Sequence, residues 1–146
     1  MSRVFTSDST GAVIHVFSND HCPPHVHARH RGEGWIARVE FSYLGGAVTL
    51  LSIAPSRNAP LRRTVNRLLD DVLAGLPACR RSWWETRGTT CLNHRWLVAL
   101  TPDRVELSPV PVADAKRIAE TRYDPDQELL WVDFEDATTL EVRARP

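Results

Sequence analysis

Residues 35–41 read Trp-Ile-Ala-Arg-Val-Glu-Phe, and this stretch decides how the first part of the chain folds. Successive side chains of a β-strand point to opposite faces, so residues at every second position share a face. One face would hold Trp35, Ala37, Val39 and Phe41. The other face would hold Ile36, Arg38 and Glu40. The pattern therefore predicts a strand with one apolar, buried face.

The flanking sequence predicts more strands and a helix. The apolar runs at 13–17 and 47–53 are typical of strands. From 61 to 76 the apolar residues recur at spacings of three and four, which predicts an amphipathic helix packed on the sheet. Pro77 interrupts this pattern, and residues 78–85 predict a short second helix.

The second half of the chain is predicted to be rich in β-structure. Two strands, at 94–100 and 104–107, precede a meander of three strands at 117–123, 128–134 and 138–143. The fold class predicted from all these elements is α+β. It consists of a small, mainly antiparallel sheet packed on one main amphipathic helix, followed by a C-terminal β-meander.

The length of 146 residues fits a first domain at 1–90 and a β-rich extension or small subdomain at 91–146. The sequence has no apolar run near the ~20 residues of a membrane span and no leader pattern, so we expect a cytoplasmic protein without a membrane partner. Its three cysteines, Cys22, Cys79 and Cys91, contain no CxxC pair. We expect all three to be reduced thiols, with Cys79 and Cys91 structural.

The charge of the chain gives no overall attraction to nucleic acid, because 18 basic and 18 acidic residues balance. Seventeen of the basic residues are arginine, which is the side chain best suited to phosphate contacts. Arg62, Arg63 and Arg67 lie on the predicted helix. They form either a phosphate-binding face or an ordinary solvated helix face.

Residues 20–30 read Asp-His-Cys-Pro-Pro-His-Val-His-Ala-Arg-His and hold four of the six histidines. Imidazole and thiolate are ligands of zinc and related ions. A residue before proline is pushed to extended conformation, so Cys22-Pro23-Pro24 predicts a polyproline strut with three residues per turn. This period places Cys22 and His25 on one side, and a following strand places His25 and His27 on one face.

Two ligand sets follow from this segment. One is Cys22, His25 and His27, and the other replaces Cys22 with His21. Three protein ligands plus water are typical of a catalytic zinc site, whereas a fourth protein ligand closes a structural site. A fourth ligand or an orienting partner would come from the remaining candidates: Asp20, His15, His30, Glu40 and His94.

The cofactor predicted from these ligand sets is a divalent transition metal, zinc first. A metal-free catalytic or ligand-contact site is one alternative. Another is a structural His-Pro loop, in which imidazoles hydrogen-bond to the backbone and to carboxylates.

Residues 20–27 resemble the signature of a small bacterial family, domain of unknown function 4160, whose members carry an H-x-P-P-H-x-H motif after a strand. The resemblance covers about residues 11–85, and Trp83-Trp84 resembles the tryptophan that often closes such domains. This chain departs from the family at Cys22, where asparagine or proline is common. The tail, at 118–142, weakly resembles the start of domain of unknown function 2442.

Members of these two families are often encoded side by side and are loosely associated with toxin–antitoxin loci. The resemblance therefore implies a regulatory, antitoxin-like binding protein whose partner is a neighbouring gene product or a second copy of the chain. The alternative is a metal-dependent hydrolase or nuclease that uses His21, His25 and His27. A third hypothesis is a bare scaffold, in which the His-Pro segment only shapes a loop.

Overall fold

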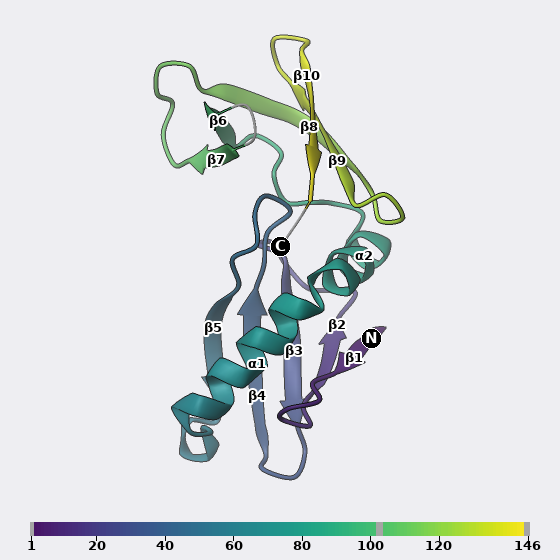
Figure 1. Cartoon of the computed structure of the whole chain (residues 1–146), viewed down its shortest axis with the longest axis vertical. Coiled ribbons are helices and arrows are strands. Elements are labelled where there is room, and N and C mark those ends of the chain that lie inside the picture. Colours follow the sequence, from purple (N-terminus) through teal and green to yellow (C-terminus); the bar gives the residue numbers. More distant parts are fainter. Residues whose placement is uncertain (1, 102–103, 145–146) are drawn as a thin grey trace.

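The computed structural model describes residues 2–101 and 104–144, which form two antiparallel five-stranded sheets and two α-helices (Figure 1). The strands of the first sheet lie side by side in chain order, each joined to the next by a short connection. They are β1 (Ser2–Thr6), β2 (Val13–Val16), β3 (His25–His30), β4 (Trp35–Glu40) and β5 (Thr49–Ala54).

The helical segment follows the first sheet and begins with a single 3-10 turn, η1 (Ser56–Asn58). Helix α1 (Arg62–Ala74) crosses one face of the sheet, and α2 (Leu76–Arg87) continues towards the second sheet (Figure 1). Gly75 separates the two helices, and Pro77 lies in the first turn of α2, where its missing N–H costs no hydrogen bond. Within the described residues, neither helix has the length and apolar character needed to cross a bilayer.

The second sheet has the strand order β10-β9-β8-β6-β7. Its strands are β6 (Trp96–Thr101), β7 (Arg104–Ser108), β8 (Lys116–Asp124), β9 (Leu129–Phe134) and β10 (Thr139–Arg143). Lys116 and Arg117 of β8 pair with Leu97 and Trp96 of β6. This pairing joins the hairpin of β6 and β7 to the three later strands.

The predicted fold class is wrong, because the chain is mostly β and has no single main helix. Helix α1 buries two residues, Leu68 and Val72, whereas the apolar residues that α2 buries are Leu76, Cys79 and Trp83. Pro77 lies in the first turn of α2 instead of ending the helical segment. The short helix predicted at 78–85 is therefore a helix of 12 residues, nearly as long as α1 with 13. The predicted C-terminal meander is part of a second five-stranded sheet. The sequence pattern also gave no indication of β1, a short edge strand without buried residues.

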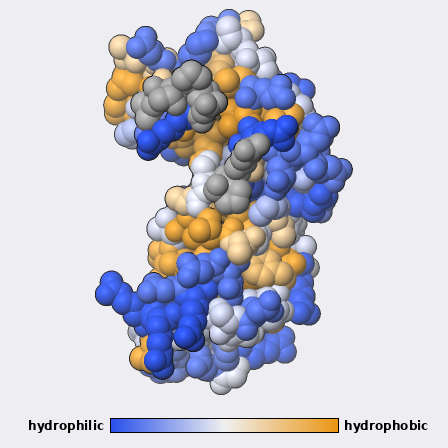
Figure 2. Space-filling model, viewed as in Figure 1, coloured by the Kyte–Doolittle hydropathy of each residue, from blue (hydrophilic) through white to orange (hydrophobic). Residues whose placement is uncertain are grey.

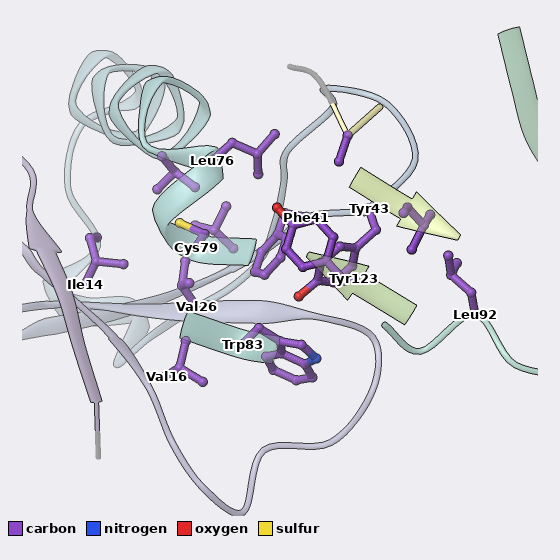
Figure 3. Close-up of a cluster of buried hydrophobic side chains, with 14 of the residues drawn as sticks. Ile14, Val16, Val26, Phe41, Tyr43, Leu76, Cys79, Trp83, Leu92 and Tyr123 are labelled. Carbon is purple, nitrogen blue, oxygen red and sulfur yellow. The ribbon is translucent and has the colours of Figure 1, made fainter. Parts of the chain in front are cut away.

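The apolar core lies between the helices and one face of the first sheet (Figure 3). The four residues predicted to share the buried face of 35–41 are all at most 2% exposed. Val16 and Val26 from the sheet pack near Cys79 and Trp83 of α2 (Figure 3). Among the described residues, no helix lies on the opposite face of the sheet (Figure 1).

The core continues into the second sheet. The ring of Tyr123 on β8 lies edge-on to the ring of Tyr43, with 4.8 Å between centroids.

On the surface, Arg81 of α2 forms an ion pair with Asp126, 2.6 Å away, in the connection between β8 and β9. The predicted boundary at residue 90 falls between α2 and β6, and the division into two separate domains stays a prediction.

The helix-bearing side of the molecule is hydrophilic where α1 begins (Figure 2). Arg62, Arg63 and Arg67 are all exposed on this helix. The opposite side of α1 is buried and includes Leu68 and Val72. The helix is therefore amphipathic, as its sequence spacing predicts.

Gly75 provides a test of the packing between the helices and β1. A Cβ atom at this position would lie 2.6 Å from Cε1 of Phe5. The φ angle of Gly75 is −94°, which alanine adopts freely, so the cost of a methyl group is steric. We expect Gly75→Ala to lower the free energy of unfolding by about 1–3 kcal/mol, measured by urea denaturation.

The matched control is the same substitution in a Phe5→Ala background. There the ring is absent, and Gly75→Ala should cost much less. An equal cost in both backgrounds would contradict this account of the packing.

Candidate functional site

Three side chains with metal-binding atoms come together at one end of the first sheet. Asp20 lies in the connection between β2 and β3, and His25 and His27 lie on β3. One ligand atom of each lies within 4.8 Å of the other two, so the group could hold a metal ion. Asp20 and His25 are buried and His27 is half-buried. The alternation of β3 places both imidazoles on one face, as the sequence predicts.

The carboxylate of Asp20 is fixed by the backbone on one side and faces the imidazoles on the other. Its Oδ2 accepts a hydrogen bond from the N–H of Phe17, at 2.9 Å. Its Oδ1 lies 2.9 Å from Nε2 of His27 and 3.5 Å from Nε2 of His25. One oxygen thus orients the group, and the other is presented to both rings.

Each imidazole is held in place by a different neighbour. Nδ1 of His25 lies 2.9 Å from the carbonyl oxygen of Pro23. A carbonyl oxygen only accepts, so Nδ1 donates this hydrogen bond, and Nε2 is the ring nitrogen that faces Asp20. The ring of His25 packs on Trp83, with 5.4 Å between centroids, and that of His27 lies edge-on to Phe17, at 4.6 Å. These contacts leave little freedom for the rings to turn.

The three side chains line an open pocket of about 280 Å³. The other residues around it are Asn19, His21, Cys22, Pro23, Arg38 and Leu51. The guanidinium of Arg38 is exposed and lies on the strand next to His27. A small ligand can therefore reach the cluster from solvent and meet a positive charge beside it.

Cys22 and Cys91 form a disulfide across 69 residues of sequence, with 5.6 Å between their Cα atoms. The expectation of reduced thiols is therefore wrong for this pair, and Cys22 offers no thiolate to a metal in this structure. Cys79 is free and buried, as expected. Disulfides persist mainly in oxidising compartments, and the cytoplasmic location stays a prediction.

The other candidates lie outside the cluster. His21 is exposed on the pocket wall. His30 is at the far end of β3, stacked on Trp35 with 5.3 Å between centroids. Glu40 stands opposite His25 in the strand register, and His15 stands opposite His27.

Asp20 and His94 show how far the sequence could rank the candidates. Asp20 was expected to be an orienting partner or a fourth ligand, yet it supplies one of the three convergent atoms. The sequence shows that Asp20 precedes the histidine motif. It does not show the turn that brings the Asp20 carboxylate back to the imidazoles. His94 lies in the connection between α2 and β6 and is exposed.

No family model, curated protein or solved structure matches the chain. The resemblance to domains of unknown function 4160 and 2442 therefore stays a prediction, together with the association with toxin–antitoxin loci. The function has to be argued from the geometry of the site.

Thiol counting tests the arrangement of the cysteines. Burial raises the pKa of the Cys79 thiol to about 12, so this thiol stays protonated and unreactive in the folded protein at neutral pH. We expect a thiol reagent to label no cysteine in the native, unreduced protein and Cys79 alone after denaturation. Denaturation with a reductant should expose all three. Three reactive thiols without reductant would show that Cys22 and Cys91 are not bonded.

Proposed function

We propose that the protein binds a zinc ion through Asp20, His25 and His27 and uses it to hydrolyse a substrate that enters the pocket. The observation that carries the proposal is the convergence of one carboxylate oxygen and two imidazole nitrogens within 4.8 Å, beside an open pocket. Two imidazoles and one carboxylate are ligands of catalytic zinc sites, which keep the fourth position for water. Iron(II) sites use the same donors, so elemental analysis must identify the ion.

A bound divalent ion supplies a water of lowered pKa and polarises an ester or phosphoryl oxygen. The side chains and backbone of the protein would orient the ligands, stabilise negative charge and accept a proton. The carbonyl of Pro23 and the N–H of Phe17 keep one imidazole and the carboxylate in a fixed orientation. Arg38 brings a positive charge to the pocket, where it can stabilise a negatively charged oxygen. His21, exposed on the same wall, is placed to take up a proton.

The regulatory, antitoxin-like role stays a prediction that rests on the family resemblance. Its partner, a neighbouring gene product or a second copy of the chain, also stays a prediction. Co-purification of the untagged protein from its own cells would test both. A stable partner that leaves the pocket open would be compatible with the hydrolase proposal.

Metal content is the first test of the proposal. Elemental mass spectrometry on zinc-reconstituted protein should find about one ion per chain, because the three ligands form a single site. His27→Ala should lose that ion. The matched control is His21→Ala, which removes an imidazole from the same pocket wall but not from the cluster, and it should keep the ion. Equal loss in both variants, or no bound ion in the wild type, would overturn the proposed site.

Hydrolysis of a chromogenic phosphodiester, bis(4-nitrophenyl) phosphate, tests the chemistry. Chelation should abolish turnover, and added zinc should restore it. His27→Ala should lower kcat/KM by at least about 100-fold, since loss of a ligand removes more than the 10–100-fold typical of a group that only orients one. Turnover that survives complete removal of metal would contradict the proposal.

A further inference from the structure

The face of the first sheet that the helices leave uncovered carries a continuous row of basic and polar side chains. In the strand register Arg3 lies opposite His15, and His15 lies opposite His27. His27 lies opposite Arg38, and Arg38 lies opposite Ser52. Neighbouring strands are about 4.8 Å apart, so a row across five strands is about 19 Å long. Of the candidate metal ligands, His27 belongs to this row.

The arginines of this face are accessible to a ligand, although Arg3 donates a hydrogen bond of 2.6 Å to Oγ1 of Thr6. Arg3, Arg29 and Arg38 are exposed, and across residues 2–101 and 104–144 none of them takes part in an ion pair. Arg29 stands in the adjoining row, opposite Val13. By contrast, four cations of the second sheet have carboxylate partners: Arg104, Lys116, Arg117 and Arg122.

His15 lies among the arginines of this face, opposite Arg3 in the strand register. Burial lowers the pKa of His15, and the charges of Arg3, Arg29 and Arg31 lower it further. Because these guanidinium groups have no carboxylate partner among the described residues, they create a positive potential over this part of the sheet, which attracts anions although the whole chain has no net charge.

Apolar side chains lie between the charges. Ile36 and Leu51 are 41% and 42% exposed, which is unusual for residues of this size in a sheet. The half-buried ring of Phe17 lies beside His27. A lone phosphate ion needs no apolar contact and spans far less than the row. A ligand with several phosphates and flat apolar groups between them fits both features.

We infer that the uncovered face of the first sheet binds a single-stranded polynucleotide, with its phosphates at Arg3, Arg29 and Arg38 and its bases over Ile36 and Leu51. Exposed sheet faces bind unpaired bases in RNA-binding domains, whereas a duplex is read by an element narrow enough to enter a groove. The inference deepens the proposed function, because the bound polynucleotide would pass the pocket. Only the hydrolysis of the polynucleotide, and not its binding, rests on the proposed zinc site.

Hydrolysis of such a ligand balances without a further reactant. A water oxygen bonds to phosphorus, and the bond from phosphorus to one sugar oxygen breaks. That sugar oxygen takes one proton of the water, and the second proton leaves as the new phosphate monoester ionises. Binding itself requires no metal, so it can be tested separately.

The test measures fluorescence anisotropy of a labelled oligothymidylate of roughly 12 nucleotides, a length within the range of single-strand binding domains. Wild-type protein is compared with Arg3→Gln/Arg29→Gln/Arg38→Gln in chelator, over a series of salt concentrations. We expect the variant to bind roughly tenfold more weakly. Its slope of log K against log salt should be shallower by about 2, because three phosphate contacts contribute about 0.7 each.

The matched control is Arg62→Gln/Arg63→Gln/Arg67→Gln, which removes the same charge from exposed positions of α1. Its affinity for the oligothymidylate should stay within about twofold of the wild type. Absence of binding by the wild type, or an equal or larger loss in the α1 variant, would overturn the inference. So would displacement of the oligonucleotide by a duplex or a polyglutamate at equal charge concentration.

The two proposals can fail separately. Arginine-dependent binding of oligothymidylate by a protein that never takes up zinc would support the inference and overturn the proposed metal site. A zinc-loaded protein that hydrolyses the small phosphodiester but does not bind oligothymidylate would overturn the inference alone.

Discussion

The attachment of α2 to one end of the first sheet is the constraint on which the rest of the structure depends. Buried Arg80 donates hydrogen bonds of 2.9 and 2.7 Å to two backbone carbonyls of the loop after β4. One turn later Trp83 packs on His25, and at the end of the helix Arg87 donates to the carbonyl of Ser18. A single helix thus closes the core and supports both the strand and the loop that carry the cluster.

The sequence predicted the features that depend on local periodicity. The alternation from Trp35 to Phe41 and the shared face of His25 and His27 require only the geometry of one strand. The fold class depends on how segments pair over long distances. The pairing of β6 with β8 turns a meander into a five-stranded sheet, and no local pattern specifies it. Proline interrupts a helix at an interior position but is favoured in the first turn, and the local sequence around Pro77 does not show that a new helix begins there.

The sequence predicted that His25 and His27 share a face, but it did not predict the disulfide of Cys22 or the position of Asp20 relative to them. Cys22 shares the side of His25 by spacing, but Cys91 lies 69 residues away and removes its thiol. Asp20 enters because a turn brings its carboxylate back to the N–H of Phe17, a contact that depends on the three-dimensional path of the loop. Which arginines remain without carboxylate partners is also decided by the fold, since the sequence contains equal numbers of both charges.

Strand β3 serves the site and the core with alternate residues. His25 and His27 belong to the site, while Val26 and Ala28 are fully buried under the helices. Insertion or deletion of one residue within this strand would exchange the two faces, placing imidazoles in the apolar core and valine at the pocket. The two functions of the strand can therefore vary by substitution, but the length of β3 cannot change without the loss of both.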